Sequence, residues 1–208
     1  MAKSNGKISL TIPFYNCDPE KEEVLKKCLD SMEGMYDELV IIDQEPRNGI
    51  GFVPAVNKCY EEATGDFIIM CCDDVILNEG NLRMLCDKEA VTSAHVLGMP
   101  YQDFWGTLWC TPRWIYEKTG PIDEEYAKGL YYDDNEYYEM INKVCKPYTN
   151  IRVVVDHPHG GRTLEKEPSR VERMERNKQY FLNKWGFPPH ILTENTAKRY
   201  GLNLPSMY

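Results

Sequence analysis

The sequence lacks several features that would place it in common protein classes. Its longest apolar run is the six residues Phe67–Cys72, whereas a membrane-spanning helix needs about 20. The N-terminal segment MAKSNGKISL has neither the apolar core nor the small-residue cleavage site of a secretory signal. We therefore expect a cytoplasmic protein, and we leave peripheral attachment to a membrane open.

Cysteine is present, but it lacks the spacing of a metal site. None of the 8 cysteines forms a C-x-x-C pair. A structural zinc site needs paired ligands at turn spacing, so the sequence predicts none. We expect free, mostly buried thiols, as in a reducing cytoplasm.

Basic residues are too few for a broad nucleic-acid surface. The chain has 24 Lys+Arg against 33 Asp+Glu, a formal charge of -9. Nucleic-acid binding would require a basic stripe, so we expect no such partner. A phosphorylated ligand remains possible if a cation or local arginines neutralise it.

The glycine patterns of two common nucleotide sites are also missing. The run Asn48-Gly49-Ile50-Gly51 has two of the three fingerprint glycines of dinucleotide-binding proteins, and Pro54 occupies the third position. No P-loop pattern occurs. The sequence therefore supports neither an NAD domain nor a P-loop nucleotidase.

The first half of the chain alternates apolar strands with amphipathic helices. Strands are predicted at 7–14, 38–43 and 66–72, and helices at 18–34 and 52–63. This order predicts a parallel sheet with right-handed crossovers, in a single domain of ordinary size.

The second half is less regular. The strands expected there are 95–101, 105–110 and 151–156, and the helices are 111–118, 133–144, 169–185 and 194–200. The helix at 169–185 has an apolar stripe and a charged face, which favours packing against the domain over membrane docking.

Polar residues follow three strands of the predicted sheet. They are Pro13–Asn16, Asp43-Gln44 and Asp73-Asp74. Ligands of parallel sheets bind beyond the carboxyl ends of the strands, so three such ends together favour a ligand crevice. The alternative is that these are ordinary polar turns.

Two acidic clusters and two histidines are candidates for chemistry. Adjacent carboxylates at Asp73-Asp74 are costly unless a cation joins them, and Mg²⁺ or Mn²⁺ suits oxygen ligands. His157 and His159 follow a predicted strand and can complete such a ligand set. The run 133–136 (DDNE) can supply a general base, although the helix dipole alone favours carboxylates there.

The residues carry a resemblance to a known family. The matching stretches are 8–16, 38–43, 48–75, 106–138 and 156–163. Together they resemble a family 2 glycosyltransferase with the GT-A fold. In this chain Cys72 stands at the first position of the Asp-x-Asp motif, Asp133-Asp134 stand where the family has Glu-Asp, and Met140 replaces a frequent arginine.

The resemblance implies a fold class and a division of the chain. The fold would be α/β, GT-A (nucleotide-diphospho-sugar transferase, Rossmann-like), with a mostly parallel central sheet flanked by helices. Residues 1–165 would form the catalytic domain, with a nucleotide-binding half at about 1–100 and an acceptor half at about 101–165. Residues 166–208 would be a helical extension packed on the same domain.

The resemblance also implies roles for individual residues. Asp134 would be the catalytic base, and Asp74 with His157 or His159 would bind Mn²⁺ or Mg²⁺. Trp105, Trp109 and Asp133 would contact the donor or acceptor sugar. The residues expected to bind the nucleotide-sugar are Pro13, Tyr15, Asn16, Asp43, Arg47, Asn48, Asn57, Asp73 and Asp74.

The implied activity is transfer of a sugar, with inversion, from a nucleotide-diphosphate sugar to a hydroxyl of a glycan or other acceptor. A UDP-sugar is the first expectation, and GDP- or dTDP-sugars are alternatives. Two other functions stay open: a non-catalytic nucleotide-sugar or carbohydrate-binding module of the same fold, and a sugar-nucleotide nucleotidyltransferase. The first has no need of a base at Asp134, and the second would need a glycine-rich basic loop that 13–18 lacks.

Overall fold

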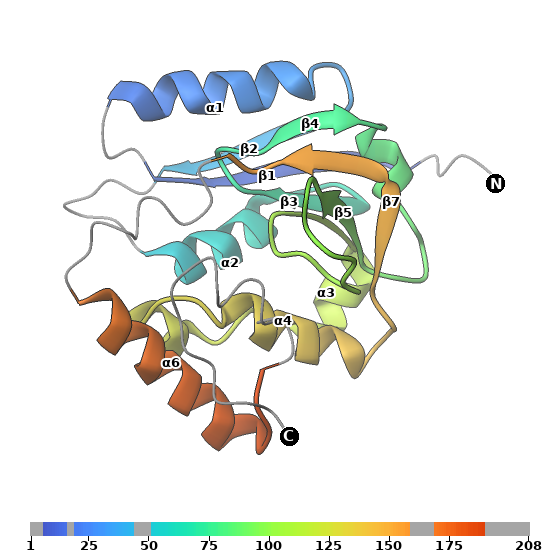
Figure 1. Cartoon of the computed structure of the whole chain (residues 1–208). Coiled ribbons are helices and arrows are strands. Elements are labelled where there is room, and N and C mark those ends of the chain that lie inside the picture. Colours follow the sequence, from blue (N-terminus) through green and yellow to red (C-terminus); the bar gives the residue numbers. More distant parts are fainter. Residues whose placement is uncertain (1–5, 16–18, 44–50, 159–168, 190–208) are drawn as a thin grey trace.

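The computed structural model describes residues 6–15, 19–43, 51–158 and 169–189, and it has a central sheet between two helical layers (Figure 1). The strands are β1 (Ile8–Phe14), β2 (Glu38–Asp43), β3 (Phe67–Cys71), β4 (Ile76–Glu79), β5 (Thr92–Val96), β6 (Leu108–Pro112) and β7 (Tyr148–Asp156). The α-helices are α1 (Pro19–Ser31), α2 (Phe52–Glu62), α3 (Arg113–Thr119), α4 (Asp133–Asn142) and α6 (Arg170–Trp185). Two 3₁₀ helices, η1 (Leu82–Leu85) and η2 (Glu124–Lys128), complete the described elements.

The sheet is mixed. Its strand order is β2-β1-β3-β6-β5-β7-β4. The pairs β1–β2, β1–β3 and β5–β7 are parallel, and the pairs β3–β6, β5–β6 and β4–β7 are antiparallel. The predicted parallel arrangement of the first three strands is therefore confirmed. Five of the seven described strands run in the same direction, in line with the expected mostly parallel sheet, and β6 and β4 run antiparallel to their neighbours.

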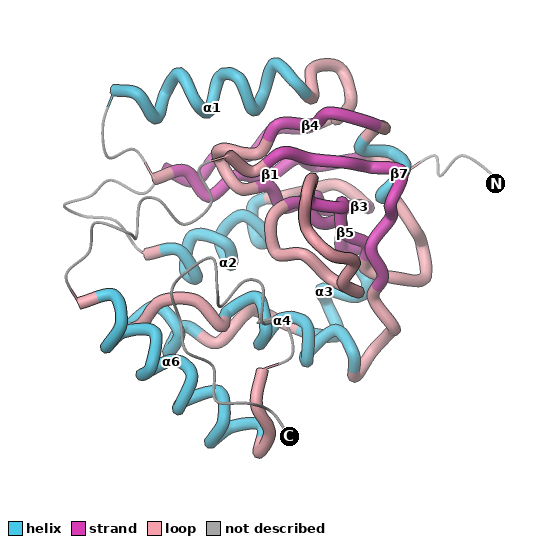
Figure 2. Tube along the Cα trace, in the orientation of Figure 1, coloured by secondary structure: helices cyan, strands magenta, loops and turns pink. Residues whose placement is uncertain are grey.

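Helix α1 covers one face of the sheet, and α2, α3, α4 and α6 lie on the other side (Figures 1 and 2). The side chains of β3 alternate between the two faces of the sheet. Phe67, Ile69 and Cys71 belong to one apolar core. Ile68 and Met70 belong to the other core. This alternation follows from the two-residue period of a strand. It explains the continuous apolar sequence of β3, which is buried on both sides.

The first core joins α1 and η1 to the sheet, and the second joins the sheet to α2, α3, α4 and α6. Members of the first core include Leu10, Ile12, Cys28, Met32, Leu82 and Val155. Members of the second core include Val56, Tyr60, Met70, Trp109, Tyr137 and Phe181. Phe181 brings α6 into the second core, and the domain boundary at residue 165 stays a prediction.

Most predicted elements form within a few residues of their expected positions. The main shifts are in the second half, where β5 begins at Thr92 and β7 extends from Tyr148. β4 was not predicted, because Ile76–Glu79 is short and half-exposed and carries no strong apolar alternation. The helix expected at 194–200 lies outside the described residues.

The seven described cysteines are free thiols, as predicted. The Sγ atoms of Cys28 and Cys71 lie 3.8 Å apart in the first core. Within the part of the chain that the structure describes, no helix is both long and apolar enough to cross a membrane.

Replacing Gly65 by alanine should destabilise the fold. An added Cβ would lie 2.6 Å from Ser9 Oγ and 2.7 Å from the Ser9 backbone nitrogen, so β1 and the α2–β3 connection would have to separate. We expect a loss of about 1–3 kcal/mol, or several degrees in Tm. Thermal unfolding of Gly65→Ala beside the exposed-site control Glu61→Ala tests this, and equal Tm values would contradict it.

Candidate functional site

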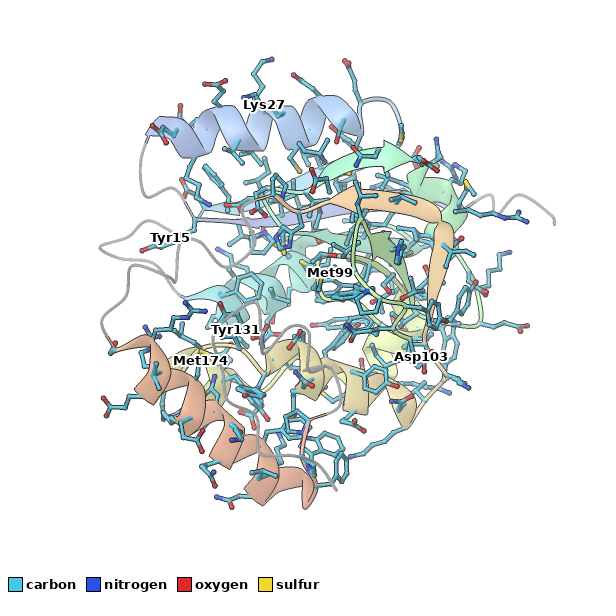
Figure 3. The ribbon with its side chains drawn as sticks, in the orientation of Figure 1. Tyr15, Lys27, Met99, Asp103, Tyr131 and Met174 are labelled. Carbon is cyan, nitrogen blue, oxygen red and sulfur yellow. The ribbon has the colours of Figure 1, made fainter. Side chains whose placement is uncertain are left out.

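The carboxyl ends of the parallel strands β1, β2 and β3 lie at one edge of the sheet, on the left in Figure 1. β1 lies between β2 and β3 and pairs Phe14 with Asp43 and Thr11 with Met70. The last residues of the three strands therefore lie at the same edge. Asp43 is exposed there, and Tyr15, labelled in Figure 3, is half-buried.

The register of β4 against β7 joins Asp74 to His157. Ile76 pairs with Asp156 in antiparallel fashion, so the residues before β4 lie beside those after β7. His157 Nε2 is 2.8 Å from Asp74 Oδ1, and the Asp74 side chain is only 7% exposed. Burial raises the pKa of Asp74, but the hydrogen bond and positive charge of His157 outweigh it, so the pKa lies below its ordinary value.

Asp73 is held by different partners. The Tyr15 backbone nitrogen donates to Asp73 Oδ2 at 3.4 Å, and Lys21 Nζ on α1 is 3.8 Å from Oδ1. Burial raises the pKa of Asp73, Lys21 opposes this shift, and the Asp74 charge adds to it. The two adjacent carboxylates thus lie in a partly desolvated site with limited compensation.

The start of β6 connects this pair to a second acidic pair. β6 runs antiparallel to β3 and pairs Leu108 with Cys71, so 105–107 lies at the carboxyl edge. The Cys72 backbone nitrogen donates to the Thr107 carbonyl at 2.9 Å. Gly106 packs against Asp134 so closely that an added Cβ would lie 2.8 Å from Asp134 Cβ. Residues 72, 106 and 134 therefore form one contiguous contact.

The electrostatics of Cys72 also link the two pairs. Burial raises the pKa of this thiol, and the charges of Asp74, Asp73 and Asp133 raise it further. Cys72 is therefore near all three carboxylates. The structure thus brings residues 73–74 and 133–134 to the same edge.

Asp133 and Asp134 begin α4 and interact strongly. Burial and the charge of Asp134 raise the pKa of Asp133 to about 7. Burial also raises the pKa of Asp134, although the Asn135 backbone and amide nitrogens donate to its Oδ1 at 2.8 and 3.0 Å. Two such carboxyls release their protons as a pair, with one proton retained toward neutral pH.

The backbone before this pair is strained. Tyr131 and Tyr132 both adopt positive φ, 58° and 69°. The left-handed region costs a non-glycine residue about 1–2 kcal/mol. Two consecutive residues persist in it only where their surroundings hold them, and such positions gather at functional sites.

The other predicted residues fall into three groups. Pro13 lies at the end of β1, beyond its last pair with β3. Asn57 is buried and uses its amide on the backbone of Ile122, accepting at 2.9 Å and donating at 2.8 Å. Asn16, Arg47, Asn48 and His159 lie outside the described residues.

The two tryptophans are both buried. Trp105 is 8% exposed, and its indole Nε1 is buried without a hydrogen-bond partner. Trp109 is 4% exposed and donates from Nε1 to the Tyr60 hydroxyl at 2.9 Å. Both are core side chains, Trp105 in the first core and Trp109 in the second, and Trp105 precedes in sequence the glycine that contacts Asp134.

Sequence reasoning missed several residues at this edge. Lys21 contacts Asp73, and Gly106 allows Asp134 to approach Cys72. Asn177 on α6 donates to the carbonyl of Tyr131. A signal for Asn177 existed, because it shares the apolar stripe of its helix with Met174 and Phe181.

A complete metal site is not assembled by the described residues alone. No group of three or more His, Cys, Asp or Glu side chains suited to a metal ion occurs among residues 6–15, 19–43, 51–158 and 169–189. The donor atoms present nevertheless fit Mn²⁺ or Mg²⁺, since Asp74 offers an ionised carboxylate beside the His157 imidazole, with Asp73 next to it.

Comparison with solved structures identifies the fold. The catalytic domain of Drosophila β1,4-galactosyltransferase 7, solved with xylobiose, matches at TM-score 0.57 and 17% identity over 76% of this chain and 72% of that one. A mannosyltransferase from Pyrobaculum calidifontis, in complex with GDP-Man and Mn²⁺, matches at TM-score 0.60 and 15% identity. The match covers 94% of this chain and 68% of that one. Glucosyl-3-phosphoglycerate synthase from Mycobacterium tuberculosis, in complex with Mg²⁺ and UDP, matches at TM-score 0.58 and 12% identity. The match covers 90% of this chain and 82% of that one.

These proteins are GT-A glycosyltransferases, and the likeness shows that this chain has the GT-A fold, as predicted. No protein-family profile matches the sequence, and no curated protein does so. The identities of 12–17% establish the fold alone.

Replacing Asp133 by asparagine should stabilise the protein at pH 8 and leave its stability nearly unchanged at pH 4. The folded-state pKa of about 7 exceeds the ordinary 3.8, so the native carboxyl costs stability progressively as the pH rises from about 4 to 7. We expect Asp133→Asn to gain about 1–2 kcal/mol at pH 8, or roughly 2–5 °C in Tm. Thermal scans in EDTA, with exposed-site Glu79→Gln as the control, measure this, and a gain independent of pH would refute it.

Proposed function

We propose that the protein is a metal-dependent glycosyltransferase, which moves a sugar from a nucleotide-diphosphate sugar to an acceptor hydroxyl with inversion. One observation carries the proposal: the Asp73–Asp74 and Asp133–Asp134 pairs, about sixty residues apart in sequence, meet at the carboxyl edge of a GT-A sheet. Ligands bind at this edge in such sheets. The free thiols are compatible with the cytoplasm as the proposed compartment.

The donor nucleotide is proposed to bind over the ends of β1, β2 and β3. Asp43 would accept a hydrogen bond from the base, and Asp73 would lie near the ribose. Its position beside the Tyr15 backbone supports this assignment. The remaining residues proposed for the nucleotide-sugar site are Pro13, Asn16, Arg47 and Asn48. Asn57 is left out, because its buried amide is already bound to the Ile122 backbone.

The proposed ligands for Mn²⁺ or Mg²⁺ are Asp74 and His157, with His159 as a further candidate. The low pKa of Asp74 keeps this carboxylate charged and ready to bind a cation at neutral pH. When bound, the cation would neutralise the departing diphosphate as a Lewis acid. This accounts for the binding of an anionic donor by a chain with a net charge of -9.

The proposed catalytic base is Asp134. Its carboxylate would take the proton from the acceptor hydroxyl as that oxygen attacks the anomeric carbon from the face opposite the diphosphate, which inverts the configuration. The two Asn135 donors stabilise the ionised form of Asp134 within the pair. Asp133 would then hold the proton that the pair retains or contact a sugar hydroxyl.

The acceptor side is proposed to include Trp105. Trp105 directly precedes Gly106 in the sequence, and Gly106 touches Asp134. The indole N–H of Trp105 has no hydrogen-bond partner. An N–H donor there can bind a sugar hydroxyl. Trp109 is left out of this proposal, because its N–H is already bound to Tyr60 in the core.

Replacing Asp134 by asparagine should abolish turnover while preserving nucleotide binding. Removing a positioned base lowers kcat by roughly 10²–10⁴-fold. We would measure transfer and donor hydrolysis with UDP-glucose, UDP-galactose and GDP-mannose in Mn²⁺, and nucleotide affinity by calorimetry. The control is Asp30→Asn on the exposed face of α1. Wild-type transfer by Asp134→Asn, or a larger loss in Asp133→Asn, would remove the assigned role.

Replacing Asp74 by alanine should weaken nucleotide binding only when the metal is present. In the wild type, Mn²⁺ with the matching member of UDP, GDP and dTDP should raise Tm by several degrees, because ligands of the native state stabilise it. Asp74→Ala should lose most of this increment and keep any metal-independent part. The increment is compared with and without EDTA, and an unchanged increment would count against the metal assignment.

A further inference from the structure

Helix α6 forms several hydrogen bonds with the segment that precedes Asp133 and Asp134. The Arg173 carbonyl accepts from the Leu130 backbone nitrogen at 3.3 Å, and Arg173 Nη2 donates to the Gly129 carbonyl at 3.0 Å. Arg176 Nη1 donates to the Glu125 carbonyl at 3.1 Å. Figure 3 shows Met174 of α6 next to Tyr131, in agreement with these contacts.

Asn177 lies at the centre of this contact and is fully buried. Its Nδ2 donates to the carbonyls of Tyr126 and Tyr131, each at 2.9 Å. Its Oδ1 accepts from Arg176 Nη1 at 2.9 Å. The amide thus donates its two hydrogens to two backbone carbonyls, one at each end of the segment 126–131.

Gly129 allows the close approach. A Cβ on this residue would lie 2.1 Å from Asn177 Oδ1 and 2.7 Å from the Arg173 carbonyl oxygen. Only a residue without a side chain fits between the turn and α6. The segment 126–131 is therefore built around the Asn177 amide.

The turn that Asn177 holds is the strained one. The Tyr131 carbonyl belongs to the peptide between the two left-handed tyrosines, and Tyr132 is the N-cap residue directly before α4. The orientation of the Tyr131–Tyr132 peptide fixes the direction in which the chain continues to Asp133 and Asp134. Without the Asn177 donor, the backbone can relax to the ordinary right-handed region, which would rotate the start of α4.

We infer that Asn177 is a positioning residue for the transfer reaction: its bond to the Tyr131 carbonyl holds the Tyr131–Tyr132 turn, which orients the Asp133–Asp134 pair toward the acceptor. This inference rests on the proposed function. It assigns to α6, more than forty residues downstream of the pair, a role in the rate of the chemical step.

The test is Asn177→Asp, which keeps the shape of the side chain and its contact with Arg176 but removes both hydrogens given to the carbonyls. We expect kcat to fall at least tenfold, because misplacement of a reacting group by about 1 Å can cost on the order of 10²-fold. The donor KM and the Kd of UDP or GDP with Mn²⁺ should stay within about twofold, since Asp73, Asp74 and His157 lie on other elements. The matched control is Asn183→Asp, an exposed position on the same helix, which should behave as wild type.

Two readouts separate positioning from simple loss of folded protein. Rates are expressed per nucleotide-binding site titrated by calorimetry, which corrects for any unfolded fraction. The titration of the Asp133 and Asp134 carboxyls, followed by NMR, should shift in Asn177→Asp and stay unchanged in Asn183→Asp. If Asn177→Asp does not fold, Arg173→Met, which removes the bond to the Gly129 carbonyl, should show a smaller loss of the same kind.

The outcomes distinguish this inference from the proposed function. A wild-type kcat per site and an unshifted carboxyl titration in the folded variant would overturn the positioning role. Absence of transfer by the wild type with every donor would instead overturn the proposed function, and the NMR titration would still decide whether Asn177 controls the pair.

Discussion

Negative charge gathered at one end of the sheet is the constraint on which the rest of the site depends. Asp73, Asp74 and Asp133 all act on Cys72, and Asp134 touches the neighbouring Gly106. Lys21 and His157 compensate the first pair only in part, because the pKa of Asp73 is still raised while that of Asp74 is lowered. Burial raises the pKa of both members of the second pair. Desolvated like charges oppose folding, so their retention at one edge indicates a use for them. A bound cation and a proton taken from an acceptor are two such uses.

The geometry of this charge cluster is set by strand direction. Because β6 runs antiparallel to β3, the segment before β6 returns to the edge where β3 ends, and Gly106 can touch both Cys72 and Asp134. Because β7 runs antiparallel to β4, His157 reaches Asp74. A fully parallel sheet would place neither segment there by these pairings. The site is therefore completed by β6, whose position was predicted without its direction, and by β4, which was not predicted.

The local hydrophobic pattern of the sequence determines which parts of the fold and of the candidate site could be predicted. The apolar runs of β1, β2 and β3 and the stripe of α2 are visible in the sequence, and so are the acidic residues that follow them. β4 could not be predicted, because a four-residue half-exposed strand carries too little pattern. The positive φ of Tyr131 and Tyr132 was equally hidden, because tyrosine has no preference for that region and only tertiary contacts impose it.

The two acidic pairs are supported from different layers of the molecule. Asp73 contacts Lys21 on α1, on one side of the sheet, whereas the turn before Asp133 is held by Asn177 on α6, on the other side (Figure 1). Among the described residues, Gly106 connects the two pairs through its contacts with Cys72 and Asp134. We expect a change in α6 to act mainly on the second pair, because Asn177 bonds to the turn before Asp133, whereas Asp73 and Asp74 contact Lys21 and His157 on other elements. Under the proposed function, donor binding would therefore depend mainly on the first pair and proton transfer mainly on the second.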